Sequence, residues 1–74
     1  MASYNAQKIF NWDRPESPAV VTVAITSGTV AVEKPAGATW VVAYTFSASG
    51  SQSLWLGRGR FRVTPSATAV YEVD

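Results

Sequence analysis

The sequence lacks cysteine and histidine altogether. Without them there can be no disulfide, no thiolate or imidazole metal site, and no catalysis by cysteine or histidine. The carboxylates that remain are few and scattered: Asp13, Glu16, Glu33, Glu72 and Asp74. General acid–base catalysis needs titratable groups that converge on one point. We therefore predict a protein that is not an enzyme and that uses no metal or other cofactor.

Long apolar runs are also missing. No stretch approaches the roughly 20 apolar residues that a membrane-spanning helix needs. The first residues, Met1–Lys8, have no apolar segment behind a basic end, so we expect no secretory signal and synthesis in a cytoplasm. The net charge of only +1 argues against a strongly electrostatic partner.

The chain is short and poor in charge. A domain of 74 residues buries only about 60% of the surface of its unfolded chain, so its own core is marginal. Charged residues make up 15% of the chain, against the usual quarter or so. Small domains without disulfides or metals often gain stability by association. We expect much of the surface to be covered, either by copies of the same chain in a trimer or other homo-oligomer, or by a larger partner.

What the sequence does contain is β-strand pattern and turn residues. Val20–Thr26 alternates apolar and polar side chains, and Ser27-Gly28 follows as a two-residue turn. Pro35-Ala36-Gly37 suits a three-residue hairpin loop, with proline first and a left-handed glycine last. We predict an all-β domain built as a five-stranded antiparallel meander. The expected strands are at about 20–26, 29–34, 38–47, 53–64 and 69–73.

A hairpin over residues 40–63 is predicted at the centre of this sheet. Gly50-Ser51 fits a two-residue turn with glycine first. That turn would place Phe46 opposite Trp55, with large side chains above Gly57 and Gly59. One face of the sheet would then be almost wholly apolar, and it includes Val21, Val23, Val30, Val32, Trp40 and Val42. Because a single sheet cannot leave such a face in water, we expect it to close into a small barrel or to pack as a sandwich.

An extended N-terminal arm, residues 1–18, is predicted ahead of the β-domain, residues 19–74. Pro15 and Pro18 place ring nitrogens where a strand ladder would need N–H groups. The arm nevertheless carries four large apolar side chains, which serve either to cover the domain's own sheet or to dock on a neighbouring subunit. These candidate interface residues are Tyr4, Ile9, Phe10 and Trp12.

Three arginines form a ladder on the opposite face of the predicted sheet: Arg58, Arg60 and Arg62. Nucleic-acid binding would need aromatic side chains beside them for base stacking, but the predicted register sends the strand aromatics to the other face. We expect Glu72 and Asp74 to pair with the ladder across strands, with an acidic protein contact or nucleic acid as the alternatives.

An apolar patch is expected beside the arginines. Its members are Val41, Leu54, Leu56 and Val70. An apolar centre with an arginine rim is typical of protein–protein interfaces, so Leu54 and Leu56 join the candidate interface residues.

The whole chain resembles the small accessory proteins of tailed bacteriophage particles, such as capsid decoration (cement) proteins and small tail or fibre components. The likeness consists of the compact β-domain behind the arm Met1–Pro18, the absence of cysteine, and strands rich in alanine, valine, threonine and serine. It implies a non-enzymatic structural protein of the virion that binds a major capsid or other virion protein and stabilises the shell. Two alternatives stay open: a small barrel that binds nucleic acid through the arginine ladder, and a phage protein that inhibits a host protein.

Overall fold

Seven β-strands make up the fold of this protein in a computed structural model, which describes residues 4–13, 16–57 and 59–74. Most of the strands are rich in the β-branched and aromatic residues that favour a pleated, half-buried surface. No helix occurs among the described residues. The strands are β1 (Lys8–Trp12), β2 (Ala19–Ala24), β3 (Val30–Ala36), β4 (Thr39–Phe46), β5 (Gly50–Leu54), β6 (Gly59–Pro65) and β7 (Val70–Val73).

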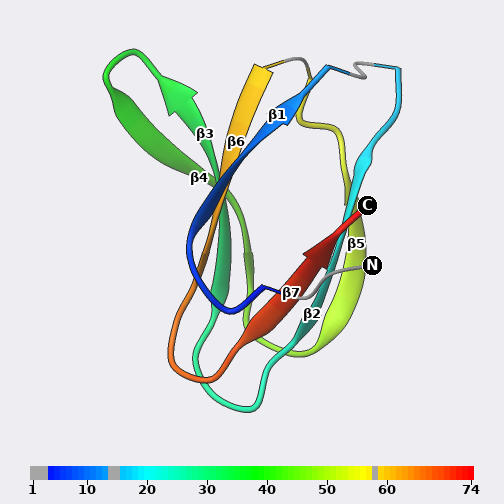
Figure 1. The fold of residues 1–74 in the computed structure, drawn as a ribbon, viewed down its shortest axis with the longest axis vertical. Helices are drawn as coiled ribbons and strands as arrows, with labels where there is room; N and C mark the ends of the chain where they lie inside the picture. The colour runs from blue at the N-terminus through cyan, green and yellow to red at the C-terminus, as the bar shows by residue number, and fades with distance from the viewer. Residues whose placement is uncertain (1–3, 14–15, 58) are drawn as a thin grey trace.

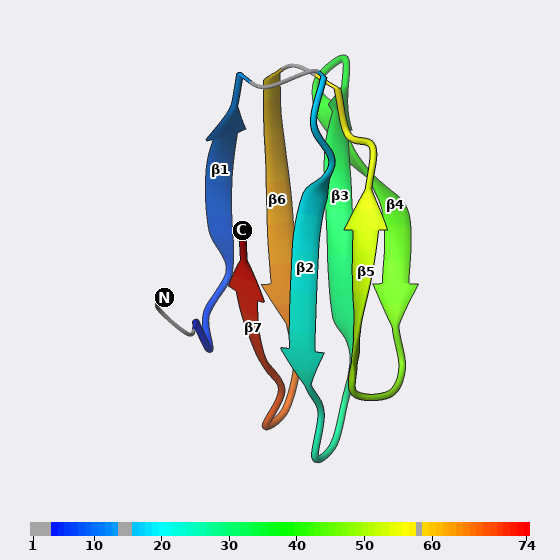
Figure 2. The ribbon, with the colours of Figure 1, turned by 90° about the vertical axis from the view of Figure 1, so that its right-hand side faces the viewer.

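The strands form two antiparallel sheets that face each other. One sheet has four strands in the order β1-β6-β3-β4, and the other has three in the order β5-β2-β7 (Figure 1). In the side view of Figure 2, β1 and β4 stand at opposite sides of the molecule, as the two edges of the larger sheet should. The prediction of an all-β fold is confirmed, and the sheets do not close into a barrel.

The core lies between the two sheets. In both sheets alternate side chains point inward, as the period-2 pattern requires. The largest fully buried side chains come from β2, β3, β6 and β7: Val21, Val30, Val32, Phe61, Val63 and Tyr71. The total exposed surface is 4341 Å², close to the roughly 4,400 Å² expected for a folded monomer of this mass. The sandwich therefore closes without help from a partner.

The predicted meander is wrong because most connections cross from one sheet to the other. β2 was expected to form a hairpin with the next strand, but it pairs with β5 and β7, whereas β3 pairs with β4 and β6. Ser27-Gly28 is a real turn, but it is a corner between sheets. The expected hairpin at Gly50-Ser51 is also absent: Gly50 and Ser51 lie inside β5, opposite Val23 and Thr22.

The hairpin of β3 and β4 is the one predicted pairing of consecutive strands that the structure contains. Its loop is tighter than expected, because Ala36 faces Thr39 and only Gly37 and Ala38 lie between them. Gly37 has a φ of +66°, the left-handed conformation for which glycine was expected here.

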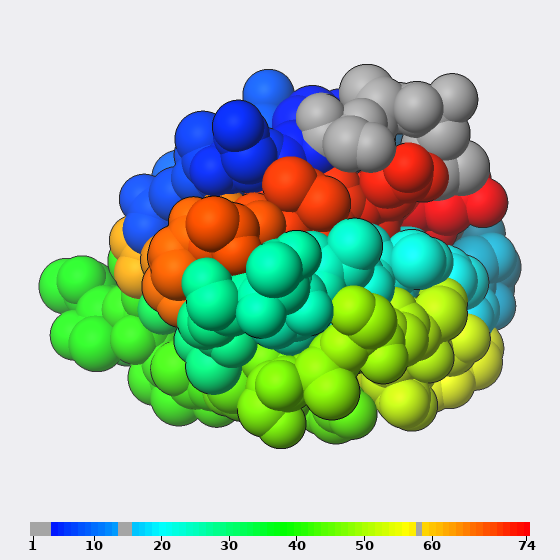
Figure 3. Space-filling view, turned by 90° about the horizontal axis from the view of Figure 1, so that it is seen from below, coloured from blue at the N-terminus to red at the C-terminus, as the bar shows by residue number. Residues whose placement is uncertain are grey.

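The tip of this hairpin leaves the body of the molecule. In the β3–β6 ladder, pairing ends at Glu33 opposite Arg62, so Pro35 would be the next residue to bond to Arg60. Proline has no N–H to donate, and the Lys34 Nζ donates instead to the Arg60 carbonyl at 3.1 Å. Figure 3 shows the hairpin tip as a green projection at the side of the molecule.

The predicted extended arm is also wrong. Residues Lys8–Trp12 form the edge strand β1, which pairs with β6 from Lys8 opposite Val63 to Trp12 opposite Gly59. Three of the four expected anchors pack within the sandwich, so the first of the two alternatives, covering the domain's own sheet, is the one found. Pro15 lies outside the described residues, and Pro18 immediately precedes β2.

Candidate functional site

The outer face of the four-stranded sheet holds an ion pair with two hydrogen bonds between neighbouring strands. We call it the arginine face and define it by Trp40, Arg60, Arg62, Glu33 and Thr64. The Arg62 Nε donates to Glu33 Oε1 at 2.8 Å, and an Arg62 terminal nitrogen donates to Oε2 at 3.2 Å. The Thr64 hydroxyl donates to the same carboxylate at 2.7 Å. The Arg62 guanidinium holds the pKa of Glu33 below its usual value, and the pKa of Arg62 is raised in turn.

Trp40 stacks beneath the two arginines of this face. The guanidinium carbon of Arg62 lies 4.7 Å from the centre of the Trp40 ring system, and that of Arg60 lies 5.9 Å from it. Such contacts are attractive because the face of an aromatic ring carries negative potential. Arg60 is exposed, and no carboxylate is found beside it among the described residues.

A β-bulge puts Trp40 on this face. Tyr44 faces Val32 and Val42 faces Glu33, so Ala43 is an extra residue of β4 with no partner in β3. One extra residue reverses the alternation of everything before it. The prediction that Trp40 and Val42 belong to the apolar face is therefore wrong, and so is the argument that no aromatic shares a face with the arginines.

The expected partners of the arginine ladder are wrong as well. Glu72 belongs to β7, and Asp74 follows it beside Val20, so both belong to the other sheet. Arg62 pairs with Glu33 instead, from the adjacent strand β3. Arg58, the third member of the predicted ladder, lies outside the described residues.

Three of the predicted interface residues are built into the sandwich. The Phe10 ring stacks on Phe61 with centroids 5.2 Å apart, and Tyr4 packs against both Phe10 and Tyr71. Trp12 is 7% exposed and meets Phe61 edge to face. These contacts hold β1 against its own domain, so these side chains are not free to anchor the protein to a neighbour.

The other predicted interface residues differ in exposure. Ile9 alternates outward on β1 and is 51% exposed. Leu54 and Leu56 are half-buried and pack against the core, so they contribute less to the surface than expected. Val70 is half-buried on the outer face of the three-stranded sheet, and the predicted patch of Val41, Val70 and the two leucines is not assembled.

The largest apolar exposure in a regular strand lies along β4, which the sequence argument placed in the middle of a sheet. Val41 is 50% exposed, Val42 52% and Tyr44 37%. β4 is an edge strand of eight residues, Thr39-Trp-Val-Val-Ala-Tyr-Thr-Phe46, without charge, proline or glycine. The signal in the sequence was the absence of any charged residue in this run, but a buried central strand gives the same pattern.

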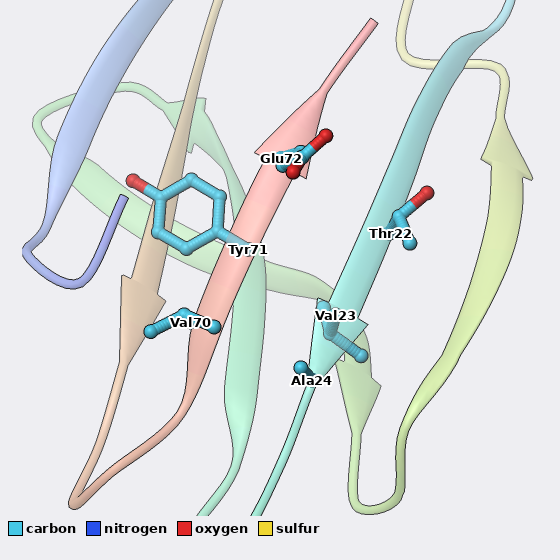
Figure 4. Close-up of a pocket in the computed structure, with 6 residues that line it drawn as sticks. All are labelled: Thr22, Val23, Ala24, Val70, Tyr71 and Glu72. Atoms are coloured by element: carbon cyan, nitrogen blue, oxygen red, sulfur yellow. The ribbon is translucent and has the colours of Figure 1, made fainter. Parts of the chain in front are cut away.

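One shallow hollow lies on the outer face of the three-stranded sheet, between β2 and β7. Its volume is about 160 Å³, and it is lined by Thr22, Val23, Ala24, Val70, Tyr71 and Glu72. Figure 4 shows that the Tyr71 ring and the Glu72 side chain leave β7 on opposite sides. The Tyr71 hydroxyl is bonded to the Ala6 carbonyl, which leaves Thr22 and Glu72 as the polar side chains of the hollow, too few to orient a small-molecule ligand.

Groups suited to metal binding do not gather in the described residues, which hold no set of three or more aspartate, glutamate, histidine or cysteine side chains. Nor do residues 4–13, 16–57 and 59–74 contain a helix able to cross a membrane. In comparisons with known proteins, no protein family, no curated protein and no solved structure matches this chain. The surface itself must therefore carry any functional argument.

Proposed function

We propose that this chain is a non-enzymatic structural protein of a virion, a decoration or cement subunit that binds the shell and further copies of itself. The observation that carries the proposal is the uncovered apolar strand β4 on a sandwich whose core is already closed. Exposed apolar surface that the fold does not need for its own core is typical of a docking surface.

The surfaces available for docking differ from those the sequence suggested. Tyr4, Phe10 and Trp12 serve the domain's own core, so the proposed contacts shift to groups that remain exposed. The strand β4 would bind further copies of the chain, and Ile9 on β1 and Arg60 at the rim of the arginine face would bind the shell. Apolar centres flanked by arginine are common in interfaces between proteins.

Sedimentation with shells tests the proposal directly. Purified protein is added to shells of the virus that encodes it, assembled without this protein. We expect it to sediment with the shells at a constant number of copies per shell and to raise the temperature at which they break. Protein that stays in the supernatant at saturating concentration would contradict the proposal.

Single-stranded nucleic acid is a second candidate ligand, and the placement of Trp40 favours it. An aromatic ring beside cationic groups is the arrangement that binds a base and its phosphate, and Arg60 has no carboxylate beside it among the described residues. The double variant Arg60→Ser, Arg62→Ser should lose binding to a labelled oligonucleotide at low salt, whereas Lys8→Ser, on the edge strand β1, should not. Unaltered mobility of the oligonucleotide with the wild-type protein would exclude this candidate.

A further inference from the structure

β4 is the least protected edge of the described sheets against pairing with another strand, because its one protective feature is the bulge at Ala43. Proteins blunt their sheet edges with short strands, charges, proline, β-bulges or a covering segment. At the other edge of the same sheet, β1 has five residues and begins with Lys8. β7 contains Glu72 and is bridged by Tyr4, which exchanges backbone hydrogen bonds with Tyr71 at 2.8 and 2.9 Å.

The fourth edge, β5, is a poor template for pairing. Its five residues, Gly50-Ser-Gln-Ser-Leu54, are mostly small and polar and have little tendency to form strands. β4 has eight residues, and valine, threonine and aromatic side chains fill all but one of its positions. An extended strand added to this sheet would therefore bind at β4.

The register of β4 shows which strand fits. Seven of its eight residues have a partner in β3, and Ala43 is the extra residue of the bulge. Counted without Ala43, the strand is symmetric about Val42, with three residues on each side. A two-fold axis through Val42 would pair Val42 with itself and Val41 with Tyr44.

This pairing also keeps every side chain on its proper face. Trp40, Val42 and Thr45 point to the outer face, and Thr39, Val41, Tyr44 and Phe46 share the inner one. The two-fold axis places Trp40 opposite Thr45 and Thr39 opposite Phe46, so outer side chains meet outer ones and inner meet inner. Each Ala43 would form a bulge against the second copy, as it does against β3.

Charge does not oppose the association of two copies. β4 contains no charged residue, and Arg60 and Arg62 lie on β6, two strands in from the edge. The arginines of the two copies would be five strand spacings apart, or about 24 Å. That distance is well beyond the screening length of about 8 Å at physiological ionic strength.

We infer that two copies of this chain pair antiparallel through β4, joining their four-stranded sheets into one continuous sheet of eight strands around a two-fold axis at Val42. This inference rests on the proposed function for the expectation that copies associate, and it names the surface they use. Main-chain hydrogen bonds along an exposed edge supply the affinity in such strand addition, and the side chains on the two faces supply the selectivity.

Light scattering after size exclusion tests the inference with a matched pair of variants. Val42 is 52% exposed at one edge of the sheet and Ile9 is 51% exposed at the other, so replacing either with lysine adds the same charge and removes similar apolar surface. We expect a dimer for the wild type and for Ile9→Lys. Val42→Lys should be monomeric, its dissociation constant raised at least about tenfold by like charges placed face to face.

Complementation tests the two-fold axis itself. Val42→Glu alone should also be monomeric, and an equimolar mixture of Val42→Lys and Val42→Glu should restore the dimer. In the unsubstituted protein, amide exchange in β4 should slow as protein concentration rises, while exchange in β1 stays unchanged.

The inference would be overturned if the wild type stayed monomeric up to about 1 mM, a concentration at which even weak dimers form, or if it formed a trimer. It would also be overturned by equal masses for Val42→Lys and Ile9→Lys, or by a mixture of Val42→Lys and Val42→Glu that stays monomeric. If a β4 variant remains a dimer and still sediments with shells, this inference fails and the proposed function stands. If the wild type forms the dimer but does not bind shells, the proposed function fails and this inference stands.

Discussion

Gly28 lies where two corners of the sandwich touch, and there is no room for a side chain at this position. Its φ is +91°, and a Cβ there would lie 2.5 Å from the Ser66 carbonyl oxygen. The corners are joined at the same point by Thr29 and Ser66, whose backbones and hydroxyls exchange hydrogen bonds of 2.8 to 3.3 Å. This glycine therefore positions β2–β3 against β6–β7.

The variant Gly28→Ala should lower the free energy of unfolding by about 2–4 kcal/mol, because it adds a steric clash to a left-handed backbone. Gly37→Ala is the matched control: its φ is +66°, but nothing lies within 4 Å of the added carbon. The control should lose only about 1–2 kcal/mol. Urea unfolding measures both, and equal losses would show that crowding at Ser66 does not matter.

Tyr71 makes stability depend on alkaline pH. Its ring is buried, its hydroxyl donates to the Ala6 carbonyl at 2.8 Å, and burial, with a smaller effect of Tyr4, raises the pKa of Tyr71 to about 12 from 10.0. Above pH 10.0 the unfolded chain loses this proton while the folded protein keeps it. Stability is therefore complete below pH 10.0 and should fall as the pH rises toward 12.

Denaturant titrations across this pH range give the test. Tyr71→Phe should be less stable at neutral pH by about 1 kcal/mol, since the Ala6 carbonyl loses its donor. It should also show a shallower loss between pH 10.0 and 12 than the wild type. If the stability of Tyr71→Phe and of the wild type fell equally over this pH range, groups other than Tyr71 would be responsible for the loss of stability at alkaline pH.

At the scale of elements, β1 is part of the core rather than an arm. Trp12 lies over Gly59 and against Phe61, and it is 7% exposed. Trp12→Ala should lower the free energy of unfolding by about 3–5 kcal/mol. Ile9→Ala, on the same strand but exposed, should change it by no more than about 0.5 kcal/mol. Circular dichroism during denaturation distinguishes the two, and an unchanged midpoint for Trp12→Ala would restore the arm hypothesis.

The ion pair of Glu33 and Arg62 ties β3 to β6. Hydrogen bonds from Arg62 and Thr64 hold the pKa of Glu33 below 4.5, so the unfolded chain takes up the proton first as the pH falls. The stabilisation is present above pH 4.5 and is lost as the pH drops through the lowered value. Glu33→Gln should lower the free energy of unfolding by about 1 kcal/mol at neutral pH. The variant should also lose less stability than the wild type as the pH falls. An acid profile identical to the wild type would contradict this assignment.

For the whole molecule, association through β4 predicts that thermal stability depends on concentration. A dimer is favoured by mass action, so a tenfold increase in protein concentration should raise Tm by about 3–5 °C. Val42→Lys should have a Tm that does not move with concentration. Differential scanning calorimetry at two concentrations provides the comparison, and a constant wild-type Tm would argue for a monomer.

Much of the local structure could be predicted from the sequence, but which strands pair with one another could not. Alternation placed Val21, Val23, Val30 and Val32 in the core, where the structure has them. Turn chemistry identified Gly37 as a left-handed position, and its φ is +66°. Alternation says which side of a strand is buried, but a turn between sheets and a turn within one sheet use the same residues. The meander failed for that reason.

The composition of the arginine face depends on a bulge at Ala43, a residue that nothing in the sequence marks as a bulge. Ala43 fits a regular strand as well as it fits a bulge, yet the bulge moves Trp40 and Val42 to the face that holds Arg60 and Arg62. A shift of one residue costs little in local propensity, and it is decided by how β3 and β4 pack against the opposite sheet.

The sequence by itself therefore determined the all-β class, the stretches that form β2, β3, β4, β6 and β7, and the absence of cysteine and histidine chemistry, because these follow from composition and period. Only the tertiary structure decided that Lys8–Trp12 is a strand of the core, that β4 is an edge and that Trp40 lies beneath two arginines. Strand pairing joins residues far apart in the chain, and the free energy that selects the partners comes from burial between the sheets rather than from any local pattern.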